Sequence, residues 1–109
     1  GDHILKSVCG TIQSALRRVD FLARYGGEEF CCILPETPFE NSMILAERIR
    51  ALVEAETYAY EGKEIRVTIS IGVPGTPGPG DTPATFLKNA DDALYKAKES
   101  GRNRVVSFA

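Results

Sequence analysis

Two adjacent carboxylates, Glu28 and Glu29, follow two adjacent glycines, Gly26 and Gly27, early in the chain. Carboxylate oxygens are hard donors that suit Mg²⁺, and a carboxylate can also accept a proton from a reacting group. Glycine has no Cβ, so a ligand could lie close to the backbone at these positions. The same four residues are also typical of an ordinary turn with solvated acids. On its own, the motif leaves a metal-assisted site and a plain turn open.

Short apolar segments flank the motif on both sides. Residues 21–23 (Phe-Leu-Ala) precede it, and residues 30–34 (Phe-Cys-Cys-Ile-Leu) follow it. Apolar runs of this length, separated by a glycine-rich stretch, predict a β-hairpin. The glycines and carboxylates would then lie at the hairpin tip.

Arg17 and Asp20 form a second candidate site, with five residues between Asp20 and the first of the glycines. Arginine offers a planar fork of donors that fits a phosphate or the edge of guanine, and a carboxylate can accept from guanine N–H groups. The alternative is a solvated helix end, where the arginine offsets the helix dipole and the aspartate pairs with a neighbour. The two residues alone favour this alternative, because isolated surface ion pairs are common.

A third candidate site has two cations, Lys98 and Arg102, on either side of Gly101. Cations at the C-terminus of a helix are ordinary, so an anion site and simple helix chemistry both remain open. Gly101 reads as the residue that ends this helix. The helix is predicted to begin at Thr82 or Thr85, and its buried face follows helical spacing through Phe86, Leu87, Ala90, Ala93, Leu94 and Ala97.

Two further helices are predicted upstream. Asp2 is placed as an N-cap for the first, whose apolar positions are Ile4, Leu5, Val8, Cys9, Ile12 and Leu16. Thr37 and Glu40 are predicted to form a capping box for the second, with Pro38 in its first turn. Arg48 lies beside the apolar stripe of this helix, where a surface arginine is the simplest interpretation.

Strands are expected in the second half of the chain. Residues 58–64 read as a strand and turn, and residues 65–73 alternate apolar and polar side chains with a period of two. Residues 74–83 are rich in proline and glycine and predict a loop, and residues 104–108 predict a closing strand.

Composition narrows the class of protein. The chain has 109 residues, is 43% hydrophobic and carries a net charge of −2, so one small domain or part of one is expected and a nucleic-acid polymer is not an expected partner. Cys9, Cys31 and Cys32 lie in apolar segments and are expected to be reduced core residues, which indicates the cytoplasm. No apolar run approaches the ~18 residues of a membrane span. The chain is therefore not expected to contact a membrane directly, although a parent protein could be attached to one.

Three separated motifs together resemble the GGDEF domains of bacterial diguanylate cyclases, in the GGEEF spelling. They are Arg-x-x-Asp at residues 17–20, Gly-Gly-Glu-Glu-Phe at residues 26–30, and the run of residues 90–103 that ends in Gly-Arg-Asn. They occur in the order found in the family, and the resemblance covers nearly the whole chain. It implies a domain that joins two GTP molecules into cyclic di-GMP and releases pyrophosphate.

The resemblance also implies roles for individual residues. Glu28 would be the catalytic proton acceptor, and Glu28 and Glu29 would hold Mg²⁺, with Mn²⁺ as an alternative. Substrate would be bound by Asp2, which would recognise guanine, by Gly26 and Gly27, and by Lys98 and Arg102, which would neutralise the GTP phosphates. Cyclic di-GMP would inhibit through Arg17, Asp20 and Arg48.

The fold implied by the resemblance is α+β, of the ferredoxin-like, palm-type cyclase kind with a βαββαβ core. Residues 1–109 match the C-terminal two-thirds of a single GGDEF domain, so we expect the first strand and its accompanying helices to be missing. Because that strand would lie inside the sheet, its loss would leave a seam of unpaired backbone groups.

Two identical domains facing one another would be needed, because each holds one GTP, so a homodimer is expected. Two other functions remain open at this point: a non-catalytic receptor for cyclic di-GMP, and a regulatory module that binds GTP or dimerises.

Overall fold

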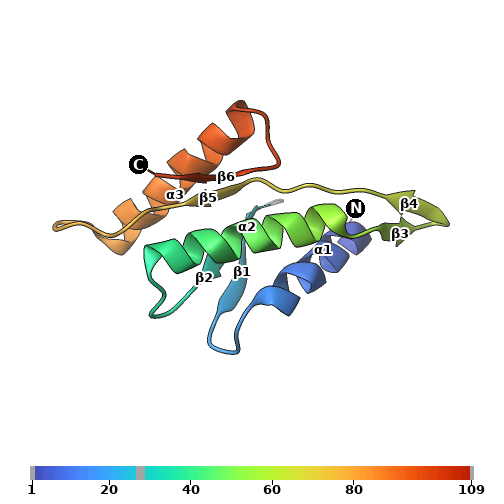
Figure 1. Ribbon diagram of the computed structural model, residues 1–109, viewed down its shortest axis with the longest axis horizontal. Coiled ribbons are helices and arrows are strands. Elements are labelled where there is room, and N and C mark those ends of the chain that lie inside the picture. Colours follow the sequence, from blue (N-terminus) through green and yellow to red (C-terminus); the bar gives the residue numbers. More distant parts are fainter. Residues whose placement is uncertain (1, 27–28, 109) are drawn as a thin grey trace.

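The computed structural model describes residues 2–26 and 29–108, without the side chains of residues 2 and 25. Helices and short strands alternate along the chain (Figure 1), in the order α1 (Asp2–Ala15), β1 (Phe21–Gly26), β2 (Glu29–Ile33), α2 (Phe39–Ala55), β3 (Tyr58–Tyr60), β4 (Lys63–Ile65), β5 (Ile71–Val73), α3 (Pro83–Glu99) and β6 (Val105–Ser107). The predicted α+β class is confirmed. The run α1–β1–β2–α2–β5 is the αββαβ part of the predicted core order.

The described strands pair in three separate two-stranded sheets. β1 and β2 form the predicted antiparallel hairpin, with Phe21 opposite Ile33 and Gly26 opposite Glu29. β3 and β4 form a second small hairpin, and β5 pairs in parallel with β6. No backbone ladder joins the first hairpin to β5 within the described residues.

The main hydrophobic core lies between α1, α2 and the start of the β3–β4 hairpin (Figure 1). Its buried members are Val8, Ile12, Ile49, Val53 and Tyr58. Val53 is fully buried, and the Tyr58 hydroxyl satisfies its polar end by donating to Thr11 Oγ1 at 3.0 Å. The two predicted amphipathic helices therefore bury the faces that their spacing indicated.

The nine-residue strand predicted for residues 65–73 is wrong in its pairing but right in its pattern. Only Ile65 at one end and residues 71–73 at the other belong to ladders. Residues 66–70 have no backbone ladder partner, although Val67 and Ile69 pack against the core. Side-chain alternation follows from an extended backbone, whereas strand pairing also needs a neighbour at hydrogen-bonding distance.

Helix α3 covers the β5–β6 pair, as Figure 1 shows. Gly72 allows α3 to approach β5 closely, since a Cβ at this position would lie only 2.8 Å from the Leu94 Cα atom. Thr82, one of the two predicted starts, is the N-cap of α3, and it shares a capping box with Thr85. At the other end Gly101 has a φ of 129°, which suits the predicted helix stop.

Three local predictions were wrong. Helix α2 has Pro38 at its N-cap and no side-chain cap, so Thr37 and Glu40 do not form a capping box. Asp2 was predicted to be the N-cap of α1, but it is already the first residue of this helix, whereas an N-cap residue would come just before it. Cys32 is exposed rather than in the core, while Cys9 and Cys31 are partly buried and all three are free thiols.

Candidate functional site

Glu29 and Lys98 meet although 69 positions separate them in the chain. Glu29 begins β2, Lys98 lies in the last turn of α3, and Lys98 Nζ donates to Glu29 Oε2 at 3.3 Å. The two side chains are 44% and 36% exposed, so the pair contributes little to stability and both groups stay accessible. The tertiary structure thus joins the glycine–carboxylate motif to the cationic end of the last helix.

A shallow pocket of about 280 Å³ surrounds this pair. Its lining residues are Glu29, Asp91, Leu94, Tyr95 and Lys98. Four of them share one face of α3, because they are spaced by three or four residues. No role was predicted for Asp91 and Tyr95, although their spacing from Lys98 places them on the same helix face and was a signal that could have identified them. A pocket of this size is large enough for part of a ligand, such as a polyphosphate group.

The tip of the first hairpin lies partly outside the described residues. The predicted roles of Gly27 and Glu28 therefore remain predictions, as does that of the Asp2 side chain. Gly26 is exposed, and a Cβ at this position would meet nothing within 4 Å. The backbone at Gly26 is therefore open to a ligand.

Of the two predicted magnesium ligands, only Glu29 lies within the described residues. Its carboxylate is a hard oxygen donor that is exposed at the pocket. The described residues contain no group of three or more histidine, cysteine or acidic side chains suited to a metal. Mg²⁺ commonly needs only one or two carboxylates and completes its shell with water and substrate phosphates. Glu29 fits such a site, and the predicted pairing with Glu28 stays a prediction.

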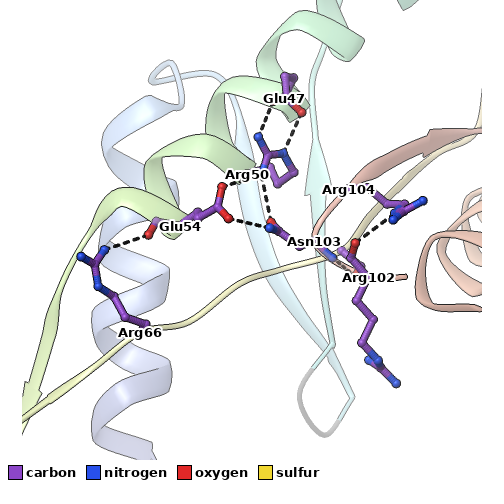
Figure 2. Close-up of polar contacts among 8 residues, drawn as sticks. Glu47, Arg50, Glu54, Arg66, Arg102, Asn103 and Arg104 are labelled. Atoms are coloured by element: carbon purple, nitrogen blue, oxygen red, sulfur yellow. Dashed lines mark hydrogen bonds and ion pairs between the residues drawn. The ribbon is translucent and has the colours of Figure 1, made fainter. Parts of the chain in front are cut away.

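Arg102 lies in the turn just after α3, as Figure 2 shows. Its backbone N–H donates to Ala97 O at 2.9 Å, and its carbonyl accepts from Arg104 Nε at 3.0 Å. The exposed guanidinium makes no hydrogen bond or ion pair with the described residues. Arg102 therefore has a fixed backbone and a side chain available for an anion.

Arg17 and Asp20 form a closed clasp rather than an open site. Arg17 donates to Asp20 through its backbone N–H at 2.8 Å, through Nε at 3.2 Å and through Nη2 at 2.7 Å. Nη2 also reaches Pro35 O at 3.0 Å and Thr37 Oγ1 at 2.7 Å. The clasp thus ties the turn after α1 to the segment before α2.

The two members of the clasp differ in what they can offer a ligand. The Asp20 side chain has no exposed surface, whereas the Arg17 side chain is 53% exposed. The guanidinium hydrogen bond holds the pKa of Asp20 below its ordinary value, so the carboxylate is ionised. Arg17 Nη1 donates to no described residue, so two N–H groups remain available on that side.

Arg48 is exposed on α2 and lines a separate depression of about 200 Å³ with Asn41, Ile44 and Leu45. Within the described part of the chain, no hydrogen bond or ion pair joins Arg48 to Arg17 or Asp20. The predicted grouping of these three residues in one inhibitory site therefore stays a prediction.

None of the described helices combines the length and apolar content that a membrane span requires.

Comparisons with known proteins support the interpretation of the motifs. Residues 1–104 match the family described as "Diguanylate cyclase, GGDEF domain". The chain is 46% identical over 111 residues to the response regulator PleD of Caulobacter vibrioides, covering all of this chain and 24% of PleD. It is also 46% identical over 106 residues to diguanylate cyclase A of Treponema denticola, covering 97% of this chain and 29% of that protein. The chain spans about a quarter of the length of these relatives.

Solved structures agree. The GGDEF domain of DgcB from Caulobacter crescentus, in complex with c-di-GMP, superimposes with a TM-score of 0.85 and 28% identity, covering 98% of this chain and 64% of that one. An active GGEEF domain of a diguanylate cyclase from Vibrio cholerae gives a TM-score of 0.82 and 31% identity, covering 99% and 68%. The match in motifs, sequence and fold shows that this chain belongs to the GGDEF domain family of diguanylate cyclases.

Proposed function

We propose that this domain condenses two GTP molecules into cyclic di-GMP. The observation that carries the proposal is the contact between Glu29 and Lys98, which unites an acidic group and a cationic group at one accessible pocket. Polyphosphate chemistry needs both kinds of group, since cations offset phosphate charge and carboxylates hold metal or accept protons.

The reaction forms one phosphodiester bond in each of two equivalent steps. The 3′-oxygen of one nucleotide attacks the α-phosphorus of the other, and the bond from that phosphorus to the bridging oxygen of pyrophosphate breaks. The hydroxyl proton leaves with the base, and the electron pair of the broken bond leaves with pyrophosphate. Two steps consume two GTP and release two pyrophosphates.

Each residue has a role in this scheme. Glu28 accepts the hydroxyl proton, and Glu28 and Glu29 hold Mg²⁺ or Mn²⁺, which when bound offsets charge on the phosphates. Lys98 and Arg102 bind the phosphate oxygens, and the open backbone at Gly26 allows the nucleotide to lie close. Asp2 and Gly27 complete the nucleotide contacts.

Two domains must face one another, because the hydroxyl and the α-phosphorus belong to different nucleotides. We therefore propose that the active form is a homodimer with one GTP on each domain.

Product regulation at Arg17 is part of the proposal. Arg17 can keep its bonds to Asp20 and still present Nη1 to a phosphate or to guanine. Asp20 then orients the arginine, since its own side chain is covered, and Arg48 adds a second cation. This exposed arginine also favours a second candidate function, a receptor that binds cyclic di-GMP without making it.

The first experiment incubates the intact protein with GTP and Mg²⁺ and separates the products by chromatography. We expect cyclic di-GMP and pyrophosphate, and we expect Glu28→Ala to abolish both. Glu64→Ala is the matched control, because it makes the same change at an exposed glutamate in β4 that does not line the pocket. Binding of cyclic di-GMP with no product at any protein concentration would favour the receptor, and the absence of both would contradict the two functions together.

A further inference from the structure

A group of four polar side chains joins α2 to the turn after α3, and the proposed site uses none of them. Only Asn103 belongs to a sequence motif, in which no role was assigned to it. We call it the α2–turn network: Glu47, Arg50, Glu54 and Asn103 (Figure 2). Arg50 donates to both carboxylate oxygens of Glu47, from Nε at 2.8 Å and from Nη2 at 2.6 Å. Its Nη1 donates to Glu54 Oε1 at 3.0 Å and to Asn103 Oδ1 at 2.9 Å.

Asn103 is held from two other directions. Its Nδ2 donates to Glu54 Oε2 at 2.6 Å, and its backbone N–H donates to Ser70 Oγ at 3.2 Å. Arg50 is the covered centre of the network, because its side chain is only 16% exposed. The Asn103 amide and then the Arg50 guanidinium hold the pKa of Glu54 below its ordinary value, so the carboxylate is ionised. Both polar atoms of the Asn103 side chain are thus satisfied by charged partners on α2.

The turn that Asn103 closes has an unfavourable backbone. Gly101, Arg102 and Asn103 have φ values of 129°, 61° and 45°, three left-handed residues in succession. Glycine adopts this region freely and asparagine tolerates it, but arginine rarely does so without outside support. The hydrogen bonds on either side of Arg102 supply that support, from Ala97 O before it and from Asn103 after it.

Surface ion pairs within α2 would need only Glu47, Arg50 and Glu54. The network also reaches beyond the helix, because Arg50 Nη1 donates a hydrogen bond to Asn103, 53 residues away in the chain. The result is selective: the Arg102 backbone is fixed, while its side chain points away from the network in Figure 2 and has no partner among the described residues.

We propose that Asn103 and Arg50 are positioning residues for the phosphate contact made by Arg102. They hold residues 101–103 in the left-handed conformation, so the Arg102 guanidinium is presented to the anion in one orientation. The proposal rests on the proposed function for the identity of the anion, the polyphosphate of a nucleotide. Neither residue contacts the ligand in this scheme, because the Arg50 guanidinium and the Asn103 amide are already hydrogen-bonded to each other and to glutamates of α2.

The test measures the affinity of the intact protein for inorganic pyrophosphate in the presence of Mg²⁺, by titration calorimetry. Asn103→Gly is the informative variant, because glycine keeps the freedom to adopt positive φ and removes only the side chain. We expect Asn103→Gly and Arg102→Ala each to weaken binding by about tenfold, since small misplacements of a binding group have large effects. The double variant should bind no more weakly than Arg102→Ala alone.

Arg50→Lys is a second variant, which keeps the charge but cannot bond Glu47, Glu54 and Asn103 together. It should reproduce the loss seen in Asn103→Gly. Lys88→Ala is the control, because it removes an exposed ion pair with Asp92 on α3 and should leave the affinity unchanged.

A purely structural role predicts a different pattern. Asn103→Gly would then lower the melting temperature but leave pyrophosphate affinity unchanged well below it, or would add its loss to that of Arg102→Ala; either result overturns the proposal. No binding by the unaltered protein, or no effect of Arg102→Ala, overturns it as well. Binding with the expected non-additive pattern but without cyclic di-GMP formation would support the positioning role and refute only the proposed reaction.

Discussion

Arg17 and Arg102 both lie just beyond the C-terminus of a helix, but they are held in opposite ways. The Arg17 side chain bonds to Asp20, Pro35 and Thr37, so it fastens one segment of the backbone to another. The Arg102 side chain bonds to no described residue, and hydrogen bonds from other residues fix its backbone instead. The Arg17 side chain therefore links two backbone segments. The backbone around Arg102, in contrast, orients a side chain that a ligand can reach.

The difference shows why a motif match does not by itself separate binding from structure. Both arginines stand in family motifs with phosphate or guanine contacts as their expected roles. Among the described residues, none bonds the Arg102 guanidinium, whereas Arg17 has only its Nη1 side without such a bond. Substitution should therefore affect mainly ligand chemistry at Arg102, and both stability and ligand binding at Arg17.

The largest effect is expected for Arg102→Ala. Formation of cyclic di-GMP by the intact protein should fall about 100-fold, because one preorganised donor to the phosphates is lost. The melting temperature should hardly change, since an exposed side chain without described partners is removed. Initial rates and a thermal melt measure the two quantities, with Lys88→Ala as control. A large drop in melting temperature would mean that the Arg102 side chain stabilises the fold, which would contradict the proposed difference from Arg17.

Arg17→Ala should show the opposite balance. We expect a clear drop in melting temperature, because the covered Asp20 carboxylate loses its charged partner. Affinity for cyclic di-GMP should fall about tenfold, the size of one lost charge-assisted hydrogen bond. Arg18→Ala is the matched control, since it removes an exposed neighbour of the same charge. Unchanged cyclic di-GMP affinity would make the clasp purely structural.

The clasp should also depend on pH. The hydrogen bond from Arg17 lowers the pKa of Asp20 from its ordinary value of 3.8, so the folded protein binds fewer protons than the unfolded chain in that range. Its contribution to stability is therefore complete above pH 3.8 and is lost as the pH falls through the lowered pKa. Urea unfolding of the unaltered protein and of Asp20→Asn should give a difference that shrinks below pH 3.8, while Arg102→Ala shows no such trend.

The smallest effect is expected for Thr37→Val. This change removes one acceptor of Arg17 Nη2 and the hydrogen bond that Thr37 Oγ1 donates to Pro35 O. The bonds that Arg17 donates to Asp20 and Pro35 stay intact. The melting temperature should fall by a few degrees at most, less than in Arg17→Ala. Cyclic di-GMP affinity should stay within about a factor of two, because Nη1 is untouched. A loss as large as that of Arg17→Ala would mean that Thr37 fixes the orientation of the arginine.

Much of the local structure could be predicted from periodicity and turn chemistry. The apolar spacing identified all three described helices, and the glycine-rich motif between apolar runs identified the first hairpin. Thr82 and Gly101 marked the ends of α3 correctly, because caps depend on the backbone within a few residues. Thr37 failed the same test, because α2 begins at Phe39 and Pro38 takes the N-cap position.

The candidate site could be predicted only in part. Glu29, Lys98 and Arg102 were identified by type and motif. The spacing of Asp91 and Tyr95 from Lys98 places them on the same face of α3, but nothing in the sequence indicated that Glu29 meets this face. Nor did the sequence indicate that Asn103 bonds Arg50. Residues 66–70 show the same limit, since their alternating pattern is real and their ladder is absent.

The sequence alone determined which segments are helical or extended, which faces are apolar, and which residue types could serve phosphate and metal chemistry. These properties depend on neighbours within one or two turns of the chain. The tertiary structure alone decided that Lys98 meets Glu29, that Arg17 is engaged and that Arg102 is presented. Those outcomes depend on hydrogen bonds between residues far apart in sequence, which local preferences cannot specify because only the packing of the helices and strands brings such residues together.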